Sequence, residues 1–242
     1  MKKVIEQFEN GFTLAEVLIT LVIIGVIAAL TIPAAVAYYQ KEETIAQLKQ
    51  VYSQLNQAIR LSVPEHGDPR TWDYSLTGID FFNEYLNNYI QIKRMSLDAN
   101  EIRYQRTDGS VENGFNPLKD GANVIVLNSG AIIYISNSSP SSSATSLRNS
   151  LKQKGFAVDT NGLKGPNKIG RDLFFFFLDG ENGMVFPRSC DDTESATVER
   201  SRDELKNGPS AEDYQCNKSG RGMWCAALII KDGWQIKDDY PW

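Results

Sequence analysis

The stretch Phe12-Thr13-Leu14-Ala15-Glu16-Val17-Leu18-Ile19-Thr20-Leu21-Val22-Ile23-Ile24-Gly25 opens a long apolar run, and that run decides the fold of this chain. The 23 residues of 17–39 carry no charge. At about 1.5 Å per residue, a helix of that length spans about 35 Å, and a bilayer core is ~30 Å thick. The sequence therefore predicts a membrane-spanning helix over 12–39.

A single carboxylate, Glu16, lies at the start of this helix. A charge beside hydrocarbon is costly unless it is paired or reaches water. Glu16 is near one end of the span, so it either extends to the headgroups or takes a cationic partner. The second reading requires an amine close to the helix start.

The leader, residues 1–11, is short and polar and begins with Lys2 and Lys3. Basic residues before a spanning helix favour a cytoplasmic N-terminus, which places the rest of the chain outside the cytoplasm. A secretory signal has its small-residue cleavage site after the apolar core, whereas Gly11 comes before it. A cut after Gly11 would leave the whole helix on the mature chain, with Phe12 first.

The string Gly11-Phe12-Thr13-Leu14-Ala15-Glu16, followed by the apolar run, resembles the class III signal of type IV prepilins and type II secretion pseudopilins. The resemblance implies that a membrane-embedded prepilin peptidase cuts after Gly11 and N-methylates Phe12. It also implies that Glu16 pairs with the Phe12 amine of a neighbouring subunit. Gly25 and Pro33 match the family pattern in which the helix loosens when it packs into a filament.

This resemblance implies a structural subunit of a type IV pilus or of a type II secretion pseudopilus, and the sequence leaves both open. Such a subunit is a single-pass protein of the bacterial inner membrane, and later part of a periplasmic pseudopilus or a surface pilus. Its expected partners are other subunits, the peptidase, the inner-membrane assembly platform and, before assembly, membrane lipid. The alternative is a membrane-anchored binding module for adhesion, DNA uptake or secretion cargo, with the Ser-rich segment 136–146 as its candidate contact.

Beyond the membrane, residues 40–62 have no Gly or Pro and read as an amphipathic helix. Apolar residues recur there at spacings of three and four, which forms one stripe: Ile45, Leu48, Tyr52, Leu55 and Ile59. We expect the stripe to pack on a sheet, with a free coiled coil as the alternative. Pro64 and Gly67 are expected to end the helix.

Residues 63–242 are predicted to form an α+β head with an antiparallel sheet, as in pilins. Aromatic residues at helical spacing over 81–90 predict a short helix, with Gly78 and Asp80 as its cap. Strands are predicted at 123–127, 131–136, 155–158, 173–178 and 184–186, and a last hairpin at 225–230 and 234–236. Residues 194–211 are polar and predict an exposed loop.

Three cysteines, Cys190, Cys216 and Cys225, lie in the predicted extracytoplasmic part, where disulfides are permitted. The Gly-rich loop 217–224 could bring Cys216 and Cys225 together, and this pair is favoured. Pairing of Cys190 with Cys216, or three free thiols, stays open.

The segment 159–172 is rich in turn formers and oxygen donors. Asp159-Thr160-Asn161-Gly162 begins like a calcium loop, in which alternate oxygens converge on a hard cation. Asp159, Asn161 and Asp172 are the candidate ligands. The alternative is a rigid loop in which Asp159 and Asn161 bond nearby backbone amides and Arg171 pairs with Asp159 or Asp172.

No enzyme is predicted. His66 is the single histidine, and no nucleotide-binding, hydrolase or metalloprotease motif surrounds it. The net charge of −5 gives no support for a general nucleic-acid surface, so no nucleic-acid partner is expected.

Overall fold

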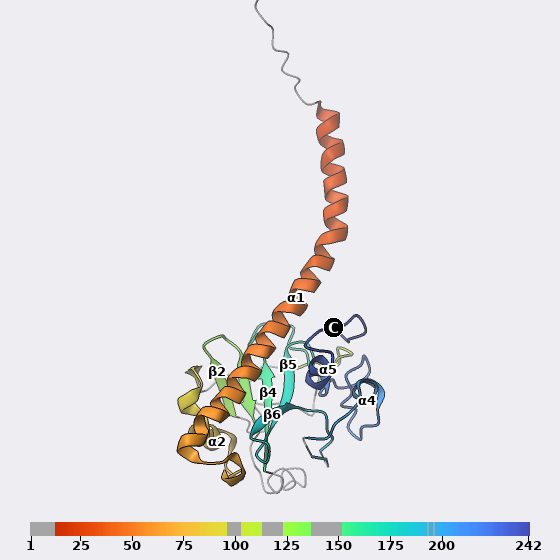
Figure 1. Cartoon of the computed structure of the whole chain (residues 1–242). Coiled ribbons are helices and arrows are strands. Elements are labelled where there is room, and N and C mark those ends of the chain that lie inside the picture. The colour runs from red at the N-terminus through yellow and green to blue at the C-terminus, as the bar shows by residue number, and fades with distance from the viewer. Residues whose placement is uncertain (1–12, 96–102, 113–122, 137–151, 193, 196) are drawn as a thin grey trace, which may run out of the picture. The chain divides into compact units, whose positions relative to one another are not determined.

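A computed structural model describes residues 13–95, 103–112, 123–136, 152–192, 194–195 and 197–242 (Figure 1). The chain divides into two compact units, one up to Glu43 and one from Thr44 to Trp242. Helix α1, Leu14–His66, belongs to both. Because the units are distinct, each is described by itself.

The second unit is built on a six-stranded antiparallel sheet in which each strand pairs with the next along the chain. The strands are β1 Ile92–Arg94, β2 Asn123–Leu127, β3 Ile132–Ile135, β4 Gln153–Asp159, β5 Leu173–Asp179 and β6 Met184–Pro187. The order β1-β2-β3-β4-β5-β6 makes the sheet a simple meander. The strands predicted at 123–127, 131–136, 155–158, 173–178 and 184–186 are confirmed within one or two residues.

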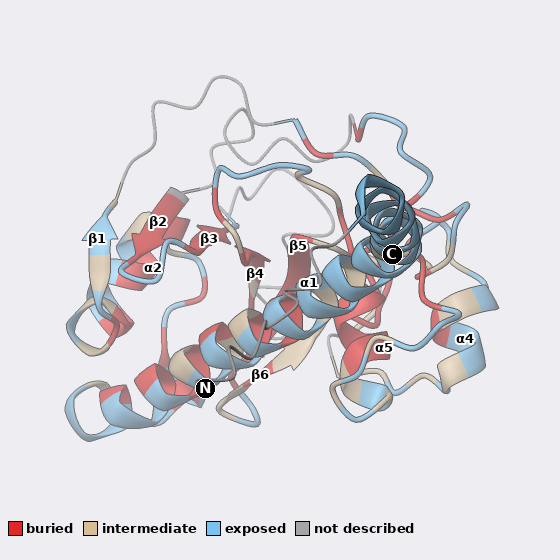
Figure 2. Ribbon diagram, turned by 90° about the horizontal axis from the view of Figure 1, so that it is seen from above, coloured by how far each residue is buried: buried red, intermediate tan, exposed pale blue. Residues whose placement is uncertain are grey.

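The part of α1 in this unit packs its apolar stripe on the sheet, as predicted. Leu48, Leu55 and Ile59 are fully buried. The ring centroids of Tyr52 and Phe176 of β5 lie 5.8 Å apart. Figure 2 shows α1 crossing the sheet with its buried residues turned toward the strands. The fold is therefore α+β, with a long N-terminal helix on an antiparallel sheet.

Strand β5 explains the run of four phenylalanines. Successive side chains of a strand point to opposite faces, and here every residue is buried. Phe176 meets α1, whereas Phe177 packs in a separate cluster with Cys190 and Val198. Both faces of β5 are thus covered, which a period-two pattern alone would not indicate.

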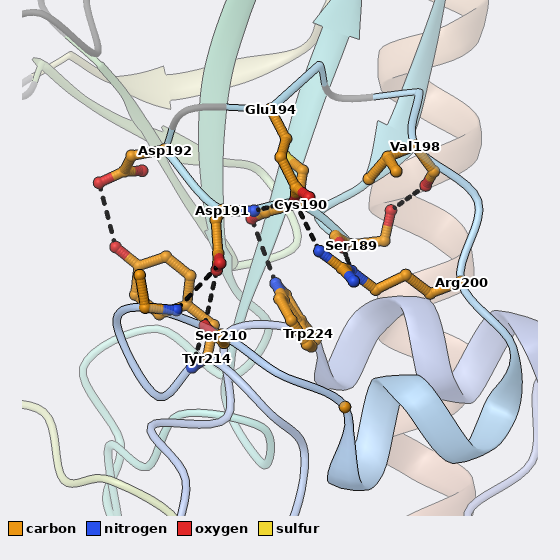
Figure 3. Close-up of polar contacts among 12 residues, drawn as sticks. Ser189, Cys190, Asp191, Asp192, Glu194, Val198, Arg200, Ser210, Tyr214 and Trp224 are labelled. Atoms are coloured by element: carbon orange, nitrogen blue, oxygen red, sulfur yellow. Dashed lines mark hydrogen bonds and ion pairs between the residues drawn. The ribbon is translucent and has the colours of Figure 1, made fainter.

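The segment after β6 supplies the second cover, and it is fixed rather than a free loop (Figure 3). Arg200 donates from Nε to the Ser189 carbonyl at 2.6 Å and from Nη2 to Glu194 Oε2 at 2.6 Å. Trp224 Nε1 donates to the Cys190 carbonyl at 3.2 Å. The charged side chains of this segment thus bond backbone carbonyls and one another. The high content of charged residues in the segment therefore did not mean that it is an exposed loop.

This segment leads into helix α4, Arg202–Asn207, inside the range predicted as a loop. Ser201 and Glu204 form a capping box, each side chain accepting a backbone N–H of the other. The loop prediction for 194–211 is therefore wrong in part. Serine followed three residues later by glutamate was the signal for this helix.

The predicted end of α1 also needs correction. Pro64 does not end the helix, which continues to His66. A proline removes one amide donor, here the one that would bond the carbonyl of Arg60, but the residues after it can still take helical dihedral angles. Gly67 ends the helix with φ +75, and its N–H bonds the Val63 carbonyl at 2.9 Å.

Helix α2, Gly78–Tyr85, is the predicted aromatic helix, flanked by the 3₁₀ turns η1 Pro69–Thr71 and η2 Asn87–Tyr89. Its cap is Thr77, not Gly78, because the Thr77 hydroxyl accepts the Asp80 N–H. Phe81 and Phe82 are fully buried, so the stripe serves packing.

The predicted C-terminal hairpin is wrong. Residues Cys225–Lys231 form helix α5. A short run buried on all sides has no period that separates strand from helix, and Ala226 and Ala227 favour helix. Gly233 has φ +74 and bonds back to the Ile230 carbonyl, so it ends a helix and makes no hairpin turn.

Candidate processing and assembly site

The first unit presents an apolar helix without a protein cover. Within the described residues, α1 is the one helix long and apolar enough to cross a membrane, and none of the span tested is buried. More than half of the surface of Leu18, Val22 and Leu30 is exposed. An apolar surface of this extent requires a bilayer or other subunits around it.

Glu16 lies on the first turn of α1 and is already hydrogen-bonded within the chain. Its Oε2 accepts the Thr13 backbone N–H at 2.8 Å and the Thr13 hydroxyl at 2.7 Å. The Glu16 N–H in turn donates to Thr13 Oγ1 at 3.2 Å. Thr13 precedes the helix, so the two residues form a reciprocal cap. The role of Thr13 was missed, although threonine three residues before glutamate is a capping signal.

Of the other predicted residues of this segment, the structure describes some and not others. The leader, Gly11 and Phe12 lie outside the described residues. Gly25 and Pro33 lie on α1, exposed, and the helix continues through both. Their predicted loosening concerns the assembled filament, so it stays a prediction.

In the head, Asp159 ends β4 and is fully buried. Its Oδ1 accepts the N–H groups of Asn161 at 3.2 Å and Gly162 at 2.9 Å, and its Oδ2 accepts the Tyr104 hydroxyl at 2.7 Å. Burial raises the pKa of Asp159 to about 7; the bond from Tyr104 opposes this shift and the Asp172 carboxylate adds to it.

Asp172 lies on the opposite side of the same loop. Its carboxylate accepts hydrogen bonds from Asn161 Nδ2 at 2.9 Å and from the Lys168 N–H at 2.9 Å. Burial raises the pKa of Asp172. Among the residues that the structure describes, no hydrogen-bond partner is found for the buried side-chain carbonyl oxygens of Asn161 and Asn167. The structure thus brings the three candidate ligands together and adds Asn167.

These contacts match the rigid loop in which aspartates bond backbone amides. Arg171 lies 4.8 Å from the centroid of the Trp242 ring. Within the described part of the chain, no group of three His, Cys, Asp or Glu residues is arranged for a metal. Calcium also binds amide oxygens, and these do not belong to the four residue types just named.

Cys216 and Cys225 form a disulfide, the favoured pairing. Cys190 is not part of this disulfide, and its side chain is fully buried. The bridge joins the loop before α5 to the first residue of that helix.

Two family models match this chain. The prokaryotic N-terminal methylation motif matches residues 8–32. That motif is the class III prepilin signal of type IV pilins and pseudopilins. A family of unknown function (DUF6613) matches residues 34–242. The chain belongs to DUF6613. A search of curated proteins and a search of solved structures each found no match.

In this DUF6613 chain, the methylation motif includes Gly11, Phe12, Glu16 and Gly25, while Pro33 falls just beyond it. The motif supports a type IV pilin-like or pseudopilin subunit that associates with other subunits and with prepilin peptidase. Together with the apolar helix it fits a membrane-anchored protein. The DUF6613 match covers the second half of α1 and the head and gives no function for them.

The motif also suggests a structural protein rather than an enzyme. His66 lies at the end of α1, its ring 5.5 Å from that of Tyr85 and its Nδ1 3.9 Å from Glu84 Oε1. These are packing and surface contacts. Of the Ser-rich segment 136–146, all but Ser136 lies outside the described residues.

Proposed function

We propose that this protein is a structural subunit of a type IV pilus or a type II secretion pseudopilus. Prepilin peptidase cuts it after Gly11 and methylates the amine of Phe12. The mature subunit then leaves the inner membrane through the assembly platform and joins the filament by its apolar helix. The observation that carries the proposal is the methylation motif at the start of a helix that is apolar and uncovered.

Glu16 makes assembly depend on cleavage of the leader. The cut creates a free amine at Phe12, and an amine and a carboxylate each cost several kcal/mol beside hydrocarbon. Pairing the Phe12 amine of one subunit with Glu16 of the next offsets much of both costs. An unprocessed leader offers no such amine, so cleavage acts as the switch for assembly. Successive copies related this way make an open fibre.

Two measurements test the proposal. Mass spectrometry of the mature chain, from cells with an active prepilin peptidase, should find N-methylated Phe12 as the first residue. Glu16→Ala should lower the yield of sheared filaments or of cross-linked subunits by about tenfold or more. Glu42→Ala, which removes a carboxylate beyond the apolar run, is the matched control. A mature chain that still begins at Met1, or wild-type assembly by Glu16→Ala, contradicts the proposal.

We also propose that the loop 159–172 binds calcium through Asp159, Asn161 and Asp172. Support comes from the two buried amide oxygens that have no hydrogen-bond partner within the described part of the chain. They lie in the same loop as two buried carboxylates whose pKa values are both raised. A divalent cation would satisfy the oxygens and neutralise the charges. Calcium at 100 times its Kd should stabilise the head by about 2.7 kcal/mol, measured as a rise in Tm that chelator reverses. An unchanged Tm in calcium and in chelator rejects the cation.

A further inference from the structure

A short hairpin, residues 103–112, lies outside the six-stranded sheet. Its two arms are joined where the Glu112 N–H bonds the Tyr104 carbonyl at 2.8 Å. The first arm is fixed to the end of β4, because the buried Tyr104 hydroxyl donates to Asp159 Oδ2 at 2.7 Å. The turn and the second arm are held by a different part of the chain.

That part is the disulfide loop, residues 217–224, which the Cys216–Cys225 bridge closes. Thr107 lies at the turn of the hairpin and is buried. Its hydroxyl oxygen is 2.5 Å from the carbonyl oxygens of both Asn217 and Gly220, which share its one hydrogen. The turn of the hairpin is thus bonded to the backbone of the disulfide loop.

Glu112 attaches the second arm to the same loop. Its side chain is fully buried, and Arg221 of the loop donates from Nε to Oε2 at 2.8 Å and from Nη2 to Oε1 at 2.9 Å. Arg106 Nε adds a bond to Oε2 at 2.9 Å. A buried carboxylate that loses a paired cation is strongly destabilised. If the loop opened and took Arg221 with it, Glu112 would move into water and the second arm would leave with it.

The loop and the hairpin also touch through Gly222. This residue has φ +80, and a Cβ placed there would lie 2.6 Å from Thr107 Cγ2. A loop that contains glycine has many conformations when its ends are free, and a disulfide removes much of that freedom. The disulfide therefore favours the loop shape that fits the hairpin.

We propose that the Cys216–Cys225 disulfide is a redox latch for the hairpin 103–112. With the disulfide formed, the loop holds the turn and the second arm on the head. With the two thiols reduced, the loop opens and releases them. Closing the latch joins the two sulfurs, while a second disulfide accepts the two electrons and two protons and becomes two thiols. The latch acts within the head and does not depend on the cut after Gly11.

Hydrogen exchange of the full-length chain in detergent, followed by mass spectrometry, tests the latch. The wild type is compared with Cys216→Ala/Cys225→Ala, and with wild type purified in dithiothreitol whose thiols are confirmed by alkylation. Loss of the disulfide should speed exchange of residues 106–112 by about a hundredfold, the order expected for a disulfide that closes a loop this short. Exchange in β4 and β5 should stay unchanged.

Two further variants separate the latch from a general loss of stability. Cys190→Ala removes a buried thiol that is outside the disulfide, and it should leave the exchange of residues 106–112 unchanged. Thr107→Val removes the hydroxyl that the loop holds. It should speed this exchange about fivefold in the oxidised chain, as for loss of one hydrogen bond. In the Cys216→Ala/Cys225→Ala background it should have little further effect.

Equal exchange of residues 106–112 with and without the disulfide overturns the inference. An equal acceleration in β4 and β5, or in Cys190→Ala, overturns it too, because the effect would then be one on the whole head. A Thr107→Val effect of the same size in both backgrounds would show that the loop holds the hairpin without the disulfide, which also contradicts the latch. None of these readouts involves cleavage or assembly, so the proposed function stands or falls separately.

Discussion

At the scale of single residues, Lys154 is the most unusual charge of the head. It belongs to β4 and is 1% exposed. Its Nζ donates to the Leu76 carbonyl at 2.6 Å and lies 5.3 Å from the centroid of the Phe81 ring. Burial lowers the pKa of Lys154 to about 8, against the attraction of Asp73. A carbonyl dipole and the face of an aromatic ring thus both contact the buried ammonium.

This pKa predicts how stability changes with pH. Between pH 8 and the ordinary lysine pKa of 10.5, the unfolded chain keeps the proton and the folded chain has lost it. The unfolded state binds more protons, so this contribution to the free energy of unfolding rises with pH across that window. Lys154→Met should flatten the rise, measured by urea unfolding of the detergent-solubilised chain at several pH values from about 7.5 to about 10.

Lys93→Met, at an exposed residue of β1, is the control and should leave the slope unchanged. An unchanged slope in Lys154→Met would show that other groups govern the pH dependence.

At the residue scale, the sequence singles out a residue whose type is costly in its surroundings, and its assembly role stays a prediction. Glu16 stood out because a carboxylate beside an apolar run needs a partner. Thr13 did not, since a threonine before an apolar helix has many uses. Asn167 was missed for another reason: the burial of its oxygen is a property of the folded loop and not of the local sequence.

At the scale of elements, the long periodic helix and the strands of the sheet were predicted, whereas the short helices α4 and α5 were not. The stripe on α1 follows from its helical spacing, and the strands predicted at 123–127 and 131–136 are the antiparallel pair β2 and β3. Helix α5 has no polar face, because it is buried on nearly every side. Its type depends on packing against β5 and β6, and packing is not a local property of the sequence.

At the scale of the whole molecule, the division at Glu43 and Thr44 predicts which piece folds alone. The main core, with buried residues from Ile45 to Tyr240, lies entirely in the second unit. A chain of residues 44–242, expressed where disulfides form, should therefore be soluble and unfold cooperatively. Size-exclusion chromatography and near-UV circular dichroism check this.

A chain of residues 61–242 is the matched control. It lacks Leu48, Leu55 and Ile59, whose loss opens a large gap over the sheet. It should be unfolded or aggregated. If 44–242 is no better folded than 61–242, the second unit depends on the apolar part of α1.

The edge strands of the sheet, β1 and β6, limit pairing with the sheet of a neighbouring chain. Edge strands invite pairing with a neighbouring chain, and native sheets limit this with short edges and prolines. β1 has three residues, and β6 has four and finishes at Pro187, which has no N–H to offer. In the proposed filament, neighbouring heads would therefore find few consecutive backbone amides with which to pair. Sheets of neighbouring chains can therefore lie close together without joining into one continuous sheet.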